Sequence, residues 1–152
     1  MKPDVLLPVS AVACNEVLEY LNLTYRPDLR MVVLRWLRDA SLPELRAGHQ
    51  AALELALLQQ ATHWFVDVRR RLAVNNAHSR WVADEFLPEA ASLLPATLRV
   101  VYLTSPNRQS VIASQPDVYA TISRSQNMSQ PYCLRSFLDE ASAMAWLFEK
   151  EA

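Results

Sequence analysis

One short segment gathers the residues best suited to hold an anion. Residues 63–79 read HWFVDVRRRLAVNNAHS, with Asp67 shortly before the consecutive arginines Arg69, Arg70 and Arg71. Guanidinium groups bind phosphates and carboxylates through paired hydrogen bonds, so these are candidate ligand-binding residues. The alternative is that Asp67 pairs with Arg69 or caps a loop, and that the other two arginines are solvated.

Four tryptophans are candidates for the wall of a ligand pocket, because such pockets are mostly aromatic and apolar. They are Trp36, Trp64, Trp81 and Trp146. If the chain is a binding module, Trp64 and Trp81 are the two expected to line its pocket, together with Arg69. The alternative is that the tryptophans belong to the core or to a dimer face.

Two common kinds of site are not expected. The only glycine is Gly48, whereas dinucleotide and P-loop sites need several glycines so that the backbone can approach a phosphate. The three histidines are His49, His63 and His78. None has a second ligand three or four residues away, the spacing that places two side chains on one helix face. We therefore expect neither a nucleotide cofactor nor a metal.

A hydrolase would need a serine, a histidine and an acid close together, and Ser79, His78 and Asp84 are available. Residues next to each other on a helix do not face each other, and the glycines of a nucleophile elbow are missing. We therefore expect no enzymatic activity.

The composition is typical of one globular domain with a proper core, since 51% of the 152 residues are hydrophobic and 20% are charged. We expect a single domain over residues 1–152, with residues 1–16 as an N-terminal extension. The 15 basic and 16 acidic residues lack the positive excess of proteins that bind phosphate backbones. Nucleic acid is therefore not an expected partner.

The two cysteines, Cys14 and Cys133, match no metal or redox spacing and favour a reducing compartment. The N-terminus resembles a lipoprotein cleavage site only faintly, because a proper apolar region is missing. No segment reaches the roughly 18 apolar residues of a membrane span. We therefore expect a cytoplasmic protein without an integral membrane segment.

Five segments have the apolar, often β-branched character of strands. Two lie between residues 17 and 37 on either side of Pro27 and Asp28, whose turn chemistry predicts an antiparallel hairpin. The other predicted strands cover residues 63–68, 98–104 and 132–137.

Capping patterns predict helices between and after these strands. Ser41 and Glu44 fit a capping box, which predicts a helix to about residue 60. The next helix should bend or restart near Pro88, because a proline inside a helix removes a backbone donor. The other expected helix caps are Asn75 or Asn76, Ser105 with an interruption at Pro116, and Asp139.

This order of elements predicts an α/β fold. Strands that alternate with helices form a mostly parallel sheet with right-handed crossovers and helices on its faces, and the first hairpin adds an antiparallel edge. Ligands bind beyond the carboxyl ends of the strands in such sheets. Asp67 and the arginines that follow it would lie at that edge.

Several motifs, in their order and spacing, resemble one known family. Trp36 ends the second strand, WFVDVRR ends the third, W-x4-FLPEA covers residues 81–90, and SFLDEASAMAWL closes the chain. With this order, roughly residues 17–150 resemble the SpoIIAA-like proteins of the STAS superfamily, in particular a bacterial branch of the Bacteroidetes type.

The resemblance implies a sheet of four or five strands used for regulatory protein contacts or, in CRAL-TRIO-like relatives, for holding lipids. In anti-sigma-factor antagonists the corresponding loop carries an Asp-Ser pair whose serine is phosphorylated. Here Asp67 is followed by Val68, and no serine occurs before Ser79. No phosphorylation site is therefore carried over to this chain.

We expect a non-enzymatic domain that acts through protein contact, as a homodimer or with a regulatory partner. The apolar residues Met144, Trp146, Leu147 and Phe148 exceed what one helix stripe can bury and suggest a partner helix. The alternative is a binding module for a small anionic or amphipathic, lipid-like ligand near the loop after residues 63–68.

Overall fold

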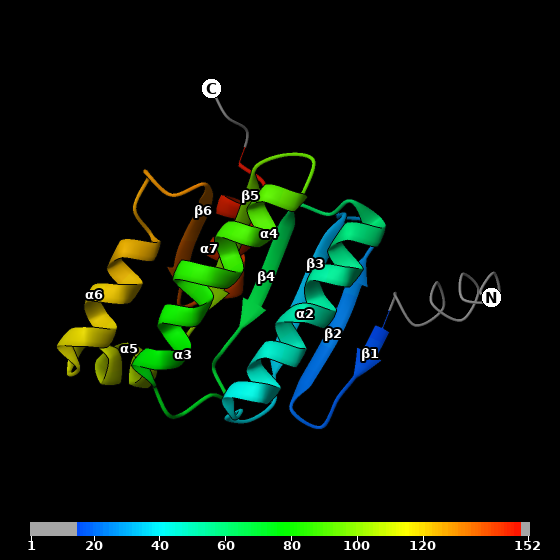
Figure 1. Cartoon of the computed structure of the whole chain (residues 1–152). Coiled ribbons are helices and arrows are strands. Elements are labelled where there is room, and N and C mark those ends of the chain that lie inside the picture. Colours follow the sequence, from blue (N-terminus) through cyan, green and yellow to red (C-terminus); the bar gives the residue numbers. More distant parts are fainter. Residues whose placement is uncertain (1–14, 150–152) are drawn as a thin grey trace.

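The computed structural model describes residues 15–149, which form one mixed six-stranded sheet with helices on both faces (Figure 1). Strand order follows chain order. The first two pairings are antiparallel and the other three are parallel. The strands are β1 (Asn15–Val17), β2 (Leu21–Arg26), β3 (Met31–Trp36), β4 (His63–Asp67), β5 (Leu98–Leu103) and β6 (Tyr132–Phe137).

The helices also follow the predicted order, and the predicted hairpin is confirmed as β2 and β3. One expectation needs correction, because the three-residue β1 adds a sixth strand to the four or five implied by the family resemblance. The helical segments are α2 (Leu42–Gln59), α3 (Asn76–Arg80), the π-helical η2 (Trp81–Phe86), α4 (Leu87–Leu93), α5 (Pro106–Ala113), α6 (Pro116–Ser125) and α7 (Glu140–Leu147).

Four predicted capping residues begin the helices as expected. Their side chains each accept a hydrogen bond from a backbone N–H in the first turn, which satisfies a donor that has no partner within the helix. These caps are Ser41 of α2, Asn75 of α3, Ser105 of α5 and Asp139 of α7.

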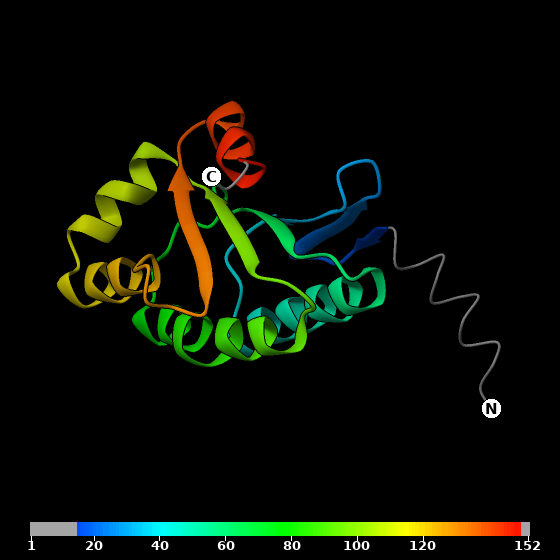
Figure 2. The same ribbon diagram turned by 90° about the horizontal axis from the view of Figure 1, so that it is seen from above.

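The helices form unequal layers. Figure 2 shows α2, α3 and α4 below the sheet, α7 above it, and α5 and α6 beside the end that carries β6. This arrangement places the carboxyl ends of β5 and β6 next to α3, α5 and α6. The crowded corner at the lower left of Figure 1 contains the site described below.

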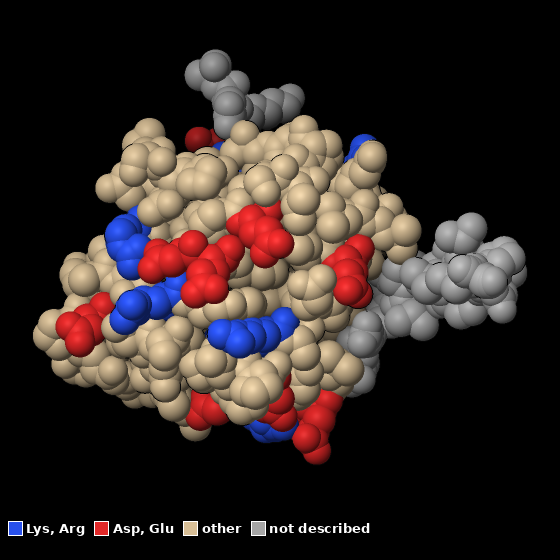
Figure 3. Space-filling model, viewed as in Figure 1, with Lys and Arg blue, Asp and Glu red and all other residues tan. Residues whose placement is uncertain are grey.

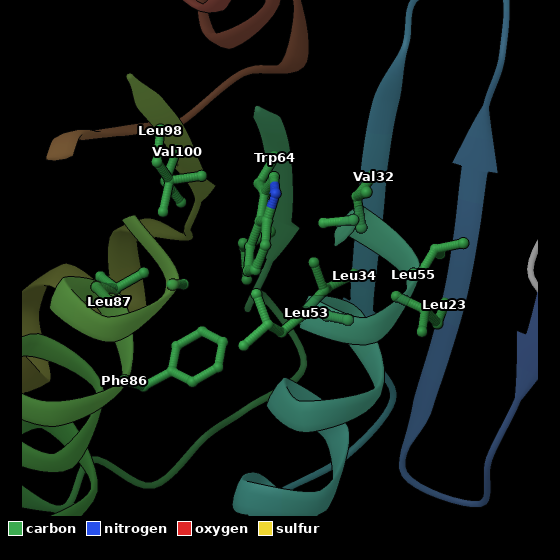
Figure 4. Close-up of a cluster of buried hydrophobic side chains, with 14 of the residues drawn as sticks. Leu23, Val32, Leu34, Leu53, Leu55, Trp64, Phe86, Leu87, Leu98 and Val100 are labelled. Carbon is green, nitrogen blue, oxygen red and sulfur yellow. The ribbon is translucent and has the colours of Figure 1, made fainter. Parts of the chain in front are cut away.

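The main core lies between the sheet and α2, η2 and α4. Trp64 extends from β4 between the helices toward Leu53 and Phe86 (Figure 4). It is 1% exposed, and its indole N–H donates to the Ala61 carbonyl at 3.2 Å. The N–H therefore has a partner, and the ring can be buried without an orphaned donor.

Gly48 lets α2 approach the sheet closely. A Cβ atom at this position would lie 2.7 Å from the Trp36 ring and 2.9 Å from Leu21. Both neighbours are buried core residues, so neither has room to move away. The single glycine of the chain therefore serves close packing.

The irregularity predicted near Pro88 takes the form of a π-helical turn. The N–H of Leu87 donates to the Val82 carbonyl, five residues back, and Pro88 has no N–H to continue the ladder. The Ala83 carbonyl instead accepts a hydrogen bond from the Tyr132 hydroxyl of β6 at 3.0 Å. A side chain from the sheet thus supplies the donor that the proline lacks.

A second, smaller core lies between the sheet and α7. Leu147 is completely buried there, and Met144 and Trp146 pack against the same cluster. Arg99 of β5 donates to the Trp146 carbonyl at 2.6 Å and to the Leu147 carbonyl at 3.2 Å. Much of the apolar surface expected to bind a partner helix is therefore covered by the chain's own sheet, while Phe148 stacks on His63.

Candidate anion-binding site

The segment from Asp67 to Arg71 is divided between the two faces of the sheet. Side chains alternate along a strand, so Asp67 faces α7, as Phe65 does, and Val68 belongs to the main core with Val66. Arg71 follows Val68 onto the main-core side and is 9% exposed. The acid and the third arginine are therefore separated, although they are four residues apart.

On the α7 face, Asp67 is fully engaged by two arginines. Its carboxylate accepts hydrogen bonds from Arg69 at 2.8 and 3.0 Å and from Arg35 of β3 at 2.9 Å. Burial raises the pKa of Asp67, but the hydrogen bonds from Arg69 and Arg35 outweigh it and leave the pKa below its usual value. Asp67 and Arg69, two of the predicted ligand-binding residues, therefore pair with each other and with Arg35, and Arg70 is exposed.

On the opposite face lies a cavity of about 380 Å³. Its floor is the end of β5, with Tyr102 and Thr104, and its walls come from α3, η2, α5, α6 and β6. Arg71 and Arg108 both line it, and no aspartate or glutamate of the described residues does. The cavity is therefore positively charged.

Arg71 is buried without an acidic partner. Its guanidinium lies 5.5 Å from the centre of the Trp36 ring, and its Nε is buried and has no hydrogen-bond partner among residues 15–149. Burial lowers its pKa below the ordinary arginine value. An unsatisfied donor on a buried cation is energetically costly.

Arg108 lies beside Arg71. It is 7% exposed, and its Nη1 donates to the Arg71 carbonyl at 2.9 Å and to the Ala73 carbonyl at 3.4 Å. Burial, together with the positive charge of Arg71, lowers the pKa of Arg108 to about 10. It also lies in the first turn of α5, where the helix dipole disfavours a cation.

No carboxylate in the described part of the chain forms an ion pair with Arg71 or Arg108. Asp39 is near enough to raise the pKa of both arginines slightly. It is exposed, however, and its carboxylate accepts from the Ala73 N–H at 3.1 and 3.3 Å. Two buried like charges thus remain largely uncompensated.

Two hydroxyl groups, one in β5 and one directly after it, add neutral donors. The Thr104 hydroxyl is buried and has no hydrogen-bond partner within the described residues. Burial raises the pKa of Tyr102, although the two arginines oppose the shift, so its phenol stays protonated at neutral pH. Both groups line the cavity with the arginines and could donate to a bound anion.

The two candidate tryptophans lie elsewhere. Trp64 is in the main core for the packing reason given above, and neither Trp64 nor Trp81 lines the cavity. Trp81 is half-buried, stacks on Phe86, and meets the buried His49 edge to face. Of the six predicted site residues, only Arg71 borders the cavity.

Sequence reasoning missed Arg108, Tyr102 and Thr104. One signal was present, because an arginine in the first turn of a helix opposes the helix dipole. The place of Arg108, three residues after the Ser105 cap, was therefore unusual. Nothing in the linear sequence indicated that it would meet Arg71, 37 residues away.

The hydrolase grouping does not assemble. His78 and Ser79 both border the cavity, but no hydrogen bond joins their side chains. Asp84 pairs with Arg124 of α6 at the surface. Among residues 15–149, no group of three or more histidine, cysteine, aspartate or glutamate side chains is placed to hold a metal ion. Cys133 is a free thiol, and Cys14 lies outside the described residues.

The face formed by α2, η2 and α4 carries acidic and basic side chains interspersed with each other (Figure 3). It therefore has no extended field of one sign of the kind that attracts a polyanion. In the described part of the chain, no helix has both the length and the apolar character needed to cross a membrane.

Comparison of the chain with protein families, with curated proteins and with solved structures gave no match. The function must therefore be argued from the cavity itself.

Proposed function

We propose that the protein is a binding module for a small anionic ligand, which Arg71 and Arg108 hold inside the cavity. The observation that carries the proposal is the burial of two neighbouring guanidinium groups at one cavity without an acidic partner. The buried Asp67 on the other face shows the usual arrangement, in which a buried charge is paired.

The charges at the cavity give it an energetic reason to accept an anion. Arg71 and Arg108 repel each other, and each has lost part of its hydration. Replacing water by an anion in a site of low dielectric would compensate both charges and satisfy the Arg71 Nε. A ligand that binds only the folded chain also stabilises it, by about 2.7 kcal/mol at a hundred times Kd.

The rest of the cavity suits an amphipathic molecule. Its walls include Val82, Leu87, Ile112 and Ile122, which would contact an apolar body while the arginines hold the head. The volume of about 380 Å³ falls within the range of about 300 to 1,000 Å³ that is common for small-molecule sites. We propose binding rather than turnover, because His78 and Ser79 do not form a nucleophile and base pair.

A thermal-shift experiment on the full chain tests this proposal. Octyl phosphate, octyl sulfate and octanoate are compared with the uncharged octyl glucoside, all below micelle-forming concentrations. We expect at least one anion to raise the midpoint in wild type and in Arg70→Met, but not in Arg71→Met. Arg70→Met is the matched control, since it removes the same charge from the same loop outside the cavity. A midpoint unmoved by every anion would contradict the proposal.

Action through protein contact, the role that the resemblance to STAS domains implies, is a second candidate function. Its support is a set of exposed leucines near the ends of α2 and α4, which both lie at the end of the sheet opposite the cavity (Figure 1). Leu57, Leu58 and Leu93 are 39%, 47% and 52% exposed there. We expect a homodimer in sedimentation equilibrium that Leu58→Glu dissociates, and a monomeric wild type would contradict it.

A further inference from the structure

Building on the proposed anion site, we infer that its ligand is a phosphate monoester attached to an uncharged, largely apolar body, rather than a carboxylate or a sulfate. The inference depends on the number of charges that face the cavity, on the donors available there, and on the character of its walls.

The charge of the site favours a dianion. Among the described residues that line the cavity, only Arg71 and Arg108 carry a full positive charge at neutral pH, and none is an acid. A monoanion would leave about one buried guanidinium uncompensated, which is costly. A phosphate monoester carries about −1.5 to −2 charges at pH 7, so it matches the two cations.

The donors favour a group with several strong acceptor oxygens. Arg71 offers a buried Nε that has no hydrogen-bond partner in the described chain. Thr104 is only 4% exposed, and its hydroxyl also has no partner there. The three terminal oxygens of a phosphate monoester could accept from both guanidinium groups and from Thr104. A carboxylate has only two oxygens to share among these donors.

The walls define the remainder of the ligand. Apart from the two arginines and His78, the described lining residues are neutral. Apolar ones such as Val82, Ile112 and Ile122 alternate with hydroxyl and amide side chains such as Thr121 and Gln126. Burial lowers the pKa of His78, so it is mostly neutral at pH 7.5. A second charged group on the ligand would have no partner, and the body is therefore expected to be uncharged.

Isothermal titration calorimetry of the full chain at pH 7.5 tests the inference. Octyl phosphate and octyl sulfate have the same chain and a similar tetrahedral head but differ by nearly one charge. We expect octyl phosphate to bind at least tenfold more tightly than octyl sulfate or octanoate. Arg71→Met should reduce the preference over sulfate to less than threefold, because one cation remains.

Two further variants separate a role in binding from a role in folding. Thr104→Val replaces an unpartnered hydroxyl by a methyl group of similar size, so the variant should fold normally. Its affinity for octyl phosphate should fall several-fold more than its affinity for octyl sulfate. Arg70→Met should leave every affinity within twofold of wild type.

The outcomes distinguish this inference from the proposed function. Equal affinities for octyl phosphate and octyl sulfate would overturn the inference and leave the anion site standing, whereas no binding of any anion would overturn both. If inorganic phosphate or AMP bound as tightly as octyl phosphate, the inference that the ligand has an apolar body would be overturned. A tenfold preference for octyl phosphate over all of these supports the inference in full.

Discussion

Two groups of arginines at the same edge of the sheet illustrate opposite uses of a positive charge. On the α7 face, Arg35 and Arg69 both donate to Asp67. On the cavity face, Arg71 and Arg108 lie side by side without an acid. Arg69 and Arg71 are two residues apart in sequence, so the face of the sheet onto which each one folds decides whether it pairs with Asp67 or lines the cavity.

The difference also has an energetic meaning. The Asp67 cluster is compensated inside the chain and therefore contributes to the fold without a ligand. Under the proposed function, an anion would compensate the cavity arginines, and their cost to the free protein would become part of the binding energy. Functional sites commonly retain such locally unfavourable arrangements.

The largest expected effect is a loss of folding stability at acidic pH, which we expect to come from the main-core face of the sheet much more than from the α7 face. Burial lowers the pKa of His49, beside the cavity face, to about 4, whereas an unfolded histidine has a pKa near 6.5. The unfolded chain then binds the extra proton, so stability falls as the pH drops from about 6.5 to 4, by about 3 kcal/mol. Urea titrations at several pH values measure this loss.

His49→Phe keeps a ring among Trp36, Trp81 and Phe86 and should remove most of the loss in that window. His63→Phe is the control on the α7 face, where the ring stacks on Phe148. His63→Phe should remove a much smaller part of the stability loss at acidic pH, because His63 is less buried than His49. An equally steep curve for His49→Phe and wild type would show that His49 is not the group responsible.

The arginines themselves provide the next test. Arg71→Met should weaken the binding of octyl phosphate at least a hundredfold, about 2.7 kcal/mol, and change the ligand-free unfolding free energy by less than about 1 kcal/mol. The small effect on folding is expected because the lost contact with Trp36 is offset by removal of an unsatisfied buried donor. Calorimetry and urea unfolding measure the two quantities.

Arg69→Met should show the reverse pattern. It removes a partner of Asp67, so the protein should lose stability while its affinity for octyl phosphate stays within about twofold of wild type. If both variants lost affinity equally, the contrast between the two faces would be mistaken.

A smaller loss of unfolding free energy is expected when the charge of Asp67 is removed. Asp67→Asn weakens the hydrogen bonds to Arg35 and Arg69, which are partly exposed, so we expect a loss of about 1 to 2 kcal/mol rather than the larger cost of a fully buried pair. The pKa of Asp67 is below its usual value. This contribution is therefore present above about pH 4 and disappears as the pH falls further, below the window of His49.

The smallest expected effect concerns the hydrogen bond between Tyr132 and the π-helical turn that forms part of the cavity wall. Tyr132→Phe removes the donor to the Ala83 carbonyl next to Pro88 and should lower the unfolding free energy by about 1 kcal/mol or somewhat more, since a buried carbonyl loses its partner. Tyr25→Phe is a control on the same side of the sheet, away from the cavity. Comparable losses in the two variants would argue against a special role for the Tyr132 hydroxyl.

The sequence by itself determined the order of the helices and of strands β2 to β6, because those signals are local, while the three-residue β1 was not predicted. The Ser41–Glu44 capping box, the turn at Pro27 and the proline at position 88 each act within a few residues. They predicted the hairpin, the start of α2 and the irregular helix at nearly the observed positions. Trp64 could be recognised as part of a buried strand, but not as a residue that lies away from the cavity.

Only the tertiary structure decided which charges meet. Asp67 finds Arg35 on a neighbouring strand, 32 residues away, and Arg71 finds Arg108 after a further strand and three helical segments. Charge pairing depends on distance and burial, which the linear order does not specify. The DVRRR segment therefore indicated the edge of the sheet at which the cavity lies, and the fold placed Asp67 in an ion cluster and Arg71 at the cavity.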